Sequence, residues 1–258
     1  MANDAGRAAA RALGDPRARP NGRWVSALTG VPIERVERVF AESDRFLAVE
    51  REIRARHRAA GRTYYAQFRA PLELYALARL LRPRHVIETG VSSGVSSAHV
   101  LLALRRNGAG RLHSIDLPTP QRGPVFGPTE SPVALPPGRA TGWAVPERLR
   151  DGWDLRIGPS QELLPSLVAG LDGVGLFLHD SLHTPTHLAF ELATVAPGLR
   201  PGAVVLADNT VWTGRAFDRF AARQGVPIRR RGRSDLVGLS VPATRSPAPR
   251  ARRAPGSR

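Results

Sequence analysis

Short apolar runs that alternate with amphipathic segments over residues 85–215 constrain the fold more than any other feature of the sequence. The runs are HVIE, RLHSIDL, WDLRI, GLFLHD and AVVLAD, and helical periodicity follows the first, third and fourth of them. Strands that alternate with helices form βαβ units, whose parallel sheet is covered by helices on both faces. Two further extended runs, VPIRR and LVGLSV, predict an antiparallel hairpin at the sheet edge. The pattern therefore predicts an α/β fold with a doubly wound, mostly parallel seven-stranded sheet.

Around this region the sequence predicts a helical extension and two tails. The 258 residues, 42% of them hydrophobic, suffice for one sizeable core. Apolar residues at helical spacing over 31–60 and the segment PLELYALARLL predict helices, so residues 23–82 are expected to form an N-terminal helical extension. Residues 1–22 and 243–258 are basic and rich in Arg, Pro and Ala, a composition typical of disordered tails. The main domain is predicted over residues 83–242.

Residues 117–147 interrupt the alternation. This segment is rich in Pro and Gly and has no hydrophobic period. It follows the carboxyl end of the second predicted strand, at the edge where open α/β sheets bind ligands. Long insertions without secondary structure are either functional or disordered, so the segment is either a lid over a ligand or a disordered loop.

The charge pattern argues against a dedicated nucleic-acid surface. The formal net charge is +16, and every fixed positive charge is an arginine. Together with the Ala, Gly and Pro richness, the missing lysine points to a compositional bias, and the charge gathers in the tails and in RRRGR at 229–233. Such arginine-rich tails are usually solvated, and RNA binding through them is the alternative.

The composition excludes several other classes. The chain has no cysteine, which excludes disulfides, thiolate zinc sites and a cysteine nucleophile. No apolar stretch approaches the ~18 residues that span a bilayer, and the first residues lack the apolar region of a secretory signal. We therefore expect a cytoplasmic protein with no membrane partner, and a homo-oligomer is compatible with the sequence.

The turn after the first strand, VIETGVSSGVSS at 86–97, restricts the kind of ligand. Three residues separate Gly90 from Gly94, so the G-x-G-x-x-G turn for a dinucleotide pyrophosphate is absent. A phosphate-binding P-loop needs four residues between the glycines and then a lysine, and neither is present. Glu88 ends the strand, where a carboxylate repels phosphate but suits an ammonium or sulfonium group. The turn therefore favours a cationic, amino-acid-like ligand.

A second acidic residue, Asp116, ends the second strand. In nucleotide-type folds an acid at this position accepts hydrogen bonds from ribose hydroxyls. S-adenosylmethionine is a ligand that combines a ribose with a cationic amino-acid end. The alternative is that Glu88 is a surface carboxylate and that the glycines only allow a tight turn from strand to helix.

Two later strands also end in acidic residues. Asp180 follows GLFLH, and Asp208 with Asn209 follows AVVLA. Carboxylate and amide oxygens are the ligands that Mg²⁺ prefers, so the three residues are a candidate metal site. The alternative is that Asp180 and Asp208 each cap the helix that follows.

His179, His183 and His187 are spaced four residues apart and match a zinc motif only loosely. A zinc motif of this spacing needs both histidines on one helix, whereas His179 ends a strand. His183 is instead a candidate general base, because an unperturbed histidine with a pKa of ~6.5 accepts a proton near neutral pH. A structural hydrogen-bonding role is the alternative for His183, and His187 is expected to be an ordinary helix residue.

These motifs, taken in order, resemble a known enzyme family. Residues 70–215 are similar to the class I S-adenosylmethionine-dependent methyltransferases, and most similar to catechol O-methyltransferase-type and natural-product (macrocin-type) O-methyltransferases. VIETGVSSGVSS, LHSID, IGPSQELLPSL, FLHDSLH and LADN carry the resemblance. It implies a Rossmann-like fold that uses S-adenosylmethionine and Mg²⁺. The implied cofactor residues are Glu88, Gly90, Gly94, Ser96, Asp116, Ser160 and Gln161, and the implied metal ligands are Asp180, Asp208 and Asn209.

The resemblance also implies methyl transfer to a hydroxyl of a small molecule. In the catechol type a lysine three residues after the first metal aspartate acts as base, and here that position is His183. We therefore expect His183 and Asp180 to be catalytic, with Trp143 and Trp212 as candidates for stacking on an aromatic acceptor. The alternatives are a methyltransferase without metal, an RNA-binding or RNA-modifying protein, and a non-catalytic cofactor-binding protein.

Overall fold

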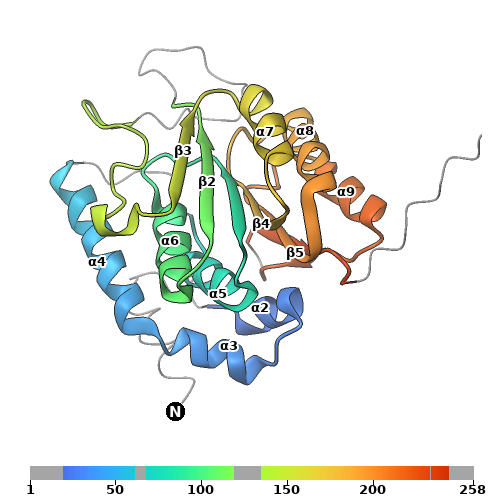
Figure 1. Ribbon diagram of the computed structural model, residues 1–258, viewed down its shortest axis with the longest axis horizontal. Helices are drawn as coiled ribbons and strands as arrows, with labels where there is room; N and C mark the ends of the chain where they lie inside the picture. Colours follow the sequence, from blue (N-terminus) through green and yellow to red (C-terminus); the bar gives the residue numbers. More distant parts are fainter. Residues whose placement is uncertain (1–19, 62–67, 119–134, 233, 244–258) are drawn as a thin grey trace, which may run out of the picture.

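The computed structural model describes residues 20–61, 68–118, 135–232 and 234–243, which fold around one sheet (Figure 1). The strands of this sheet lie in the order β3-β2-β1-β4-β5-β7-β6. β1 to β5 are parallel, and β7 is antiparallel to both of its neighbours. This confirms the predicted mostly parallel sheet with an antiparallel C-terminal hairpin. The strands are β1 (His85–Thr89), β2 (Arg111–Asp116), β3 (Trp153–Ile157), β4 (Val174–His179), β5 (Leu199–Ala207), β6 (Arg229–Arg230) and β7 (Val237–Ser240).

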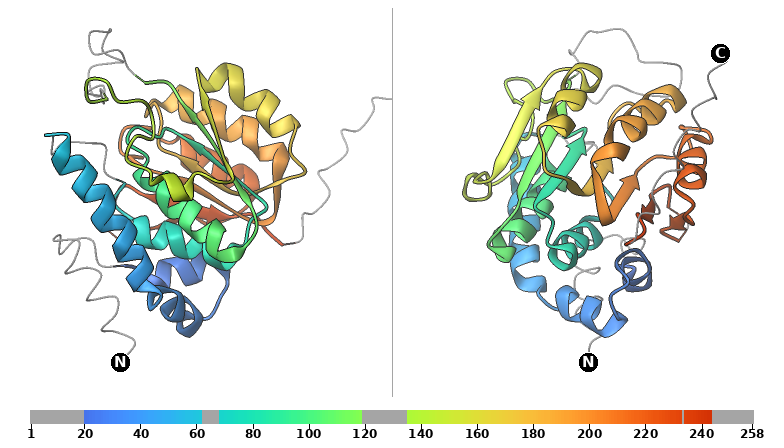
Figure 2. Two further views of the ribbon diagram at one scale, coloured as in Figure 1. Left: turned by 60° about the vertical axis from the view of Figure 1, so that its left-hand side comes forward. Right: turned by 45° about the vertical axis from the view of Figure 1, so that its right-hand side comes forward.

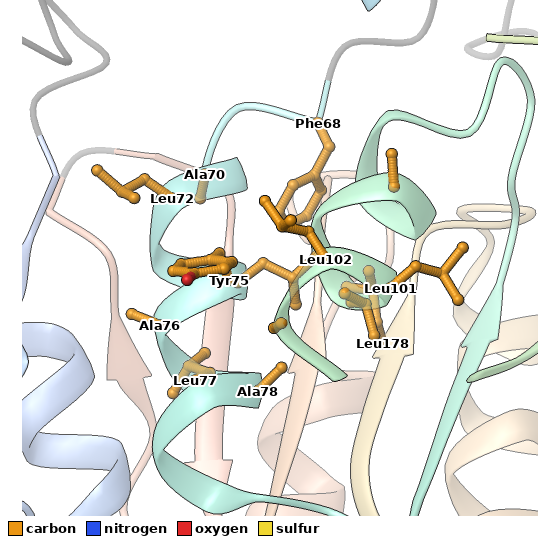
Figure 3. Close-up of a cluster of buried hydrophobic side chains, with 14 of the residues drawn as sticks. Phe68, Ala70, Leu72, Tyr75, Ala76, Leu77, Ala78, Leu101, Leu102 and Leu178 are labelled. Carbon is orange, nitrogen blue, oxygen red and sulfur yellow. The ribbon is translucent and has the colours of Figure 1, made fainter. Parts of the chain in front are cut away.

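Helices cover both faces of the sheet because its central strands are apolar on both sides. α5 (Pro71–Leu81) and α6 (Val95–Asn107) lie against one face, and α7 (Ser160–Ala169), α8 (Pro185–Val195) and α9 (Ala216–Gln224) lie against the other (Figure 1 and Figure 2). Neighbouring residues of β4 serve different cores: Leu178 packs with α5 and α6, as Figure 3 shows, whereas Phe177 packs beneath α7, α8 and α9. Each such buried side chain stabilises the fold by about 1.5–3 kcal/mol.

α9 is a helix that the sequence analysis did not predict. Its buried side chains Phe217 and Phe220 are three residues apart, which is a helical spacing. The segment is only nine residues long, and Gly225, with a φ of +66°, ends it. A period of so few residues is weak evidence in the sequence, and packing on the sheet stabilises the helix instead. Two single-turn 3₁₀ helices, η2 (Glu147–Leu149) and η3 (Ala196–Gly198), complete the assignment.

The N-terminal extension contains α2 (Gly22–Thr29), α3 (Ile33–Phe40) and α4 (Ser43–Ala59), followed by α5. The helical stretch predicted over 31–60 is therefore interrupted, at Ala41 and Glu42. The Glu42 carboxylate accepts hydrogen bonds from Arg79 at 2.9 and 3.0 Å and lies 3.1 Å from Arg106 Nε. These contacts hold the interruption against α5 and α6, which the hydrophobic period alone does not reveal.

α2, which falls in the predicted helical extension but was not delimited there, lies against the C-terminal hairpin. Trp24 Nε1 donates a hydrogen bond to the carbonyl oxygen of Arg229 at 2.9 Å. The buried carboxylate of Glu73 in α5 accepts hydrogen bonds from Arg231 and, at 3.0 Å, from the backbone nitrogen of Asn21. One hydrophobic cluster runs from α2 to α6 and onto the sheet face. The extension therefore shares the core of the sheet.

Part of the predicted insertion, residues 119–134, lies outside the described residues, as do 1–19 and 244–258 of the predicted tails. The described end of the insertion packs on the glycine turn, where the Gly142 nitrogen donates to the Ser92 carbonyl at 2.8 Å. Trp143 is buried, with its ring centroid 5.0 Å from that of His57. Stacking of Trp143 on an acceptor is therefore a wrong prediction, because this side chain packs in the core. No helix in the described ranges has the length and apolarity to cross a membrane.

Candidate active site

The carboxyl ends of neighbouring parallel strands bring the predicted site residues to one edge of the sheet. Thr89 of β1 is in register with Ile115 of β2 and with His179 of β4, and His179 is in register with Ala207 of β5. The residues that follow these positions therefore start from the same level. They are Gly90, Asp116, Asp180, Asp208 and Asn209.

Both glycines of the first turn are required by close approaches of the chain. Gly90 has a φ of +86°, and a Cβ atom here would lie 1.9 Å from the carbonyl oxygen of Asp180. Gly94 has a φ of +90°, and its Cβ would lie 2.4 Å from Val145 Cγ2 at the end of the insertion. The turn is therefore held between β4 and the insertion, and contact of these glycines with a cofactor stays a prediction.

Glu88 is fully buried, which contradicts the alternative of a surface carboxylate. Its Oε2 accepts hydrogen bonds from Ser97 Oγ at 2.6 Å and Ser114 Oγ at 2.8 Å. Burial raises the pKa of Glu88 to about 7 and the charge of Asp180 adds to the rise, whereas the hydroxyls of Ser96, Ser97 and Ser114 oppose it. Its Oε1 is buried and makes no well-formed hydrogen bond within the described residues. Such an oxygen suits a cationic N–H donor from a ligand.

Asp116 joins the glycine turn to the end of the insertion. Its Oδ1 accepts a hydrogen bond from the Val91 nitrogen at 3.0 Å, and its Oδ2 accepts one from Thr141 Oγ1 at 2.7 Å. Thr141 was not predicted, because it lies in a segment without hydrophobic period. The carboxylate retains further acceptor capacity beside these two bonds, since its two oxygens offer about four lone-pair positions.

Asp180, Asp208 and His183 gather where β4 and β5 end. Burial raises the pKa of Asp208 to about 7, and the negative charge of Asp180 adds to this rise. His183 Nε2 lies 3.5 Å from Asp180 Oδ1. Asn209 has a φ of +51° and donates its backbone N–H to Asp208 Oδ1 at 3.0 Å. The structure thus brings together two carboxylates that repel each other, an imidazole and an amide.

Neither aspartate caps a helix, so that alternative is wrong. The N-cap of α8 is Thr184, whose hydroxyl accepts a hydrogen bond from the His187 nitrogen at 3.3 Å, and the N-cap of α9 is Arg215. Within the described ranges, no group of three or more His, Asp and Glu side chains is arranged to hold a metal ion. A metal site at this edge would consist of two carboxylates and the Asn209 amide.

A buried network that was not predicted connects this edge to α7 and α8. Its centre is Glu191 of α8, which is fully buried. Although burial alone would raise a carboxyl pKa, the His179 and His187 rings hold the pKa of Glu191 well below its usual range. Side chains that surround the carboxylate at 2.7 to 3.0 Å are Thr89, Ser160, His179, Ser181 and His187.

The network includes one predicted cofactor residue and contacts another. Ser160 Oγ donates to Glu191 Oε1 at 2.7 Å, and Gln161 Nε2 lies 3.1 Å from His187 Nδ1. The expectation that His187 is an ordinary helix residue is wrong, because its ring is buried between Glu191 and Gln161. The spacing of His187 and Glu191 by four residues on one helix is the sequence signal that indicates their contact.

Comparison with solved structures identifies proteins of similar fold. The similar solved structures include TomG, an O-methyltransferase of Streptomyces achromogenes involved in tomaymycin synthesis, in complex with SAM (22% identity, 75% of this chain and 89% of that chain, TM-score 0.52). They also include an O-methyltransferase from Bacillus cereus in complex with SAH (15%, 75% and 90%, 0.53) and a putative O-methyltransferase from Klebsiella pneumoniae (18%, 76% and 90%, 0.50). At these identities the likeness concerns the fold. No curated protein matches the chain.

A family model described as a methyltransferase domain matches residues 87–210. This range begins in β1 and ends just after Asn209, so it contains the glycine turn, Asp116, the Glu191 network and the aspartate pair. It also covers the five parallel strands that the sequence predicted. Residues 87–210 of this chain are thus a methyltransferase domain, and the similar solved structures agree with its fold.

Proposed function

We propose that this enzyme transfers the methyl group of S-adenosylmethionine to a hydroxyl group of a small molecule, with the assistance of Mg²⁺. The observation that carries the proposal is the arrangement of one sheet edge. The buried carboxylate of Glu88 lies at β1, and its Oε1 makes no well-formed hydrogen bond to the described residues. A pair of aspartates with a histidine lies at the ends of β4 and β5. The names of the structurally similar O-methyltransferases support oxygen as the atom that is methylated.

The cofactor would lie along the ends of β1, β2 and β3. Glu88 Oε1 would accept a hydrogen bond from the ammonium group of its methionine part, and Asp116 would accept hydrogen bonds from its ribose. Exposed apolar side chains at the ends of β2 and β3, Leu117 and Ile157, would flank its base. The other proposed cofactor residues are Gly90, Gly94, Ser96, Ser160 and Gln161.

Cofactor binding is expected to depend on the ionisation of Glu88. Because the pKa of Glu88 is raised to about 7, the ionised form grows from about a tenth to about nine tenths between pH 6 and pH 8. Because Glu88 would accept a hydrogen bond from the ammonium group of S-adenosylhomocysteine, binding of this ligand should tighten about tenfold over this range. Glu88→Gln should weaken binding and remove the pH dependence. Isothermal titration of S-adenosylhomocysteine at both pH values measures both effects.

The same substitution is expected to stabilise the ligand-free protein at pH 8. The folded state holds the Glu88 proton up to about pH 7 and the unfolded state only to about pH 4.5, so stability falls as pH rises through this window. Glu88→Gln removes this loss of stability because glutamine does not ionise. The free energy of unfolding of the variant at pH 8 should therefore exceed that of the wild type by on the order of 2–3 kcal/mol. Urea unfolding measures this. Glu73→Gln, which changes another buried carboxylate, serves as control and should only destabilise. A Glu88→Gln protein that is less stable than wild type at pH 8 would contradict the interpretation.

The reaction is an in-line displacement at the methyl carbon. The acceptor oxygen forms the new C–O bond as the C–S bond breaks, the sulfonium becomes the thioether of S-adenosylhomocysteine, and the hydroxyl proton is lost. We propose that His183 takes this proton and that Asp180, 3.5 Å from Nε2, stabilises the resulting imidazolium. Holding the acceptor in line contributes up to about 7–11 kcal/mol to catalysis in ideal cases.

The aspartate pair supports the metal in this proposal. Burial and the negative charge of Asp180 raise the pKa of Asp208, and a divalent cation between the two carboxylates would relieve their repulsion. Asn209 would add an amide oxygen of the kind that Mg²⁺ accepts. Asp180, Asp208 and Asn209 would hold it. When bound, Mg²⁺ would polarise the acceptor hydroxyl and lower its pKa.

Trp212 is proposed to contact the acceptor. Its side chain is 47% exposed, the adjacent Val211 is 63% exposed, and the Trp212 nitrogen donates to the Asn209 carbonyl at 3.1 Å. An exposed indole beside the aspartate pair offers a flat apolar face to an aromatic acceptor. Trp212→Ala should raise the KM for catechol about tenfold and leave S-adenosylhomocysteine binding unchanged, whereas Trp212→Phe should retain most of the affinity. Equal KM values for wild type and Trp212→Ala would contradict this role.

The acceptor, the cytoplasmic location, the domain boundaries and the oligomeric state stay predictions.

A further inference from the structure

The Glu191 carboxylate fixes the proton of the His187 ring. Glu191 is fully buried and surrounded by hydroxyl and imidazole groups that stabilise its ionised form. An ionised carboxylate only accepts hydrogen bonds, so the His187 Nε2 atom, 2.9 Å from Glu191 Oε1, must carry a proton. The Gln161 amide nitrogen, which can only donate, lies 3.1 Å from the other ring nitrogen, Nδ1, so Nδ1 accepts and the single N–H of the ring is at Nε2.

The His187 ring in turn fixes the side-chain amide of Gln161. The Gln161 side-chain nitrogen lies 3.1 Å from His187 Nδ1, and an acceptor there requires a donor from glutamine. The amide nitrogen of Gln161 is therefore turned toward the ring. Its carbonyl oxygen is the end that remains for a ligand, and Gln161 is exposed at the start of α7.

The position of Gln161 places this acceptor beside the proposed base of the cofactor. Gln161 follows β3, and the nitrogen of Gly158 donates to the Asp116 carbonyl at 2.9 Å, so the start of α7 adjoins the ribose-binding acid. The side chains of Leu117 and Ile157, 53% and 55% exposed, are the apolar surface between them. A base on a ribose held at Asp116 would extend toward this surface.

We propose that Glu191, acting through His187, is a positioning residue that makes Gln161 present a hydrogen-bond acceptor, so that the site selects a base with an exocyclic amine over a 6-oxo base. The inference rests on the proposed use of S-adenosylmethionine, whose adenine carries such an amine. Without the His187 contact the amide can rotate and satisfy either an amine or an oxo group, and the selection is lost.

Paired titrations test the relay. S-adenosylhomocysteine and its deaminated analogue S-inosylhomocysteine, which has a 6-oxo group, are titrated by calorimetry into the full-length wild type, His187→Phe and Glu191→Gln. The wild type should prefer the amine ligand by about tenfold or more, because the oxo group would face a fixed carbonyl oxygen. His187→Phe keeps an aromatic ring without its nitrogens. In this variant the ratio of the affinities for the amine and the oxo ligand should fall toward one. This fall should come mainly from tighter binding of the oxo analogue.

A purely structural role would weaken both ligands equally and leave their ratio unchanged, which would overturn the proposal. Glu73→Gln is the matched control, because Glu73 lies in α5 and contacts Arg231 instead of the Glu191 network. This variant should keep the wild-type ratio of the two affinities. Should Glu191→Gln fail to fold, His187→Phe alone decides, because it leaves the other bonds to Glu191 in place. Wild type that binds neither ligand would overturn the proposed function itself, whereas tight binding with an unchanged ratio in the variants would overturn only the relay.

Discussion

Gly90→Ala is expected to destabilise the protein by more than about 4 kcal/mol and to abolish S-adenosylhomocysteine binding. The new Cβ would lie 1.9 Å from the Asp180 carbonyl oxygen and 2.4 Å from its carbonyl carbon, and both are backbone atoms that cannot rotate away. The φ of +86° adds strain of about 1–3 kcal/mol for any residue with a side chain. Relief requires β1 and β4 to separate where the cofactor would bind.

Urea unfolding of Gly90→Ala measures this effect, and Gly108→Ala is a matched control. Gly108 follows α6 with a φ of +68°, but a Cβ there meets no atom within 4 Å. The control therefore carries only the conformational cost, about 1 kcal/mol, and should still bind S-adenosylhomocysteine. Equal free energies of unfolding for the two variants would show that the approach of Gly90 to Asp180 has no energetic importance.

Asp208→Ala is expected to reduce turnover at least about a thousandfold while it changes S-adenosylhomocysteine affinity by no more than about threefold. The substitution removes one of the two carboxylates proposed to hold Mg²⁺, but Glu88 and Asp116 lie at other strands and keep their contacts. The loss of turnover is measured with catechol and S-adenosylmethionine. The unchanged cofactor affinity is measured by calorimetric titration of S-adenosylhomocysteine. Asp218→Ala, on the exposed side of α9, is the control and should retain activity.

Metal binding itself provides an independent measurement. Mn²⁺ is titrated into the wild type and Asp208→Ala and followed by its paramagnetic signal, and the variant should lose the site. EDTA should remove turnover from the wild type, and Mg²⁺ should restore it. Full turnover in EDTA would contradict the proposed role of Mg²⁺. His183 and Asp180 would then activate the acceptor without a metal ion.

Most of the sheet was predictable because its strands are encoded locally. Runs such as GLFLHD are apolar on both faces, which is sufficient to predict a central parallel strand. The hairpin at the sheet edge and the helix at Pro71 were predictable from other local patterns, namely two consecutive extended runs and an apolar segment of helical length. By contrast, α2 and α9 are short, and they owe their stability to contacts with residues distant in sequence, such as that of Trp24 with Arg229. A local period does not contain such information.

The site was predictable in position and less so in environment. Parallel strands place Glu88, Asp116, Asp180 and Asp208 at one edge, and residue type alone indicates their chemistry. The burial of Glu88 depends on how α6 packs, as does the lack of a well-formed hydrogen bond at its Oε1 among the described residues, and the sequence pattern does not contain this. Glu191 was missed because a charged residue in a helix is usually solvated. Its burial depends on donors from Thr89, Ser160 and His179, which come from three separate elements.

The contact between α2 and β6 has a consequence for the order in which the chain folds. Trp24 and Arg229 are 205 residues apart. At a synthesis rate of about 5–20 residues per second, roughly 10–40 s therefore pass between the synthesis of α2 and that of β6. Until then the apolar face of α2 has no sheet edge to cover. Closing so long a loop is also slow in refolding from denaturant. Completion of the core is therefore a late event, and a nascent chain released before the hairpin is made would expose that face to chaperones and proteases.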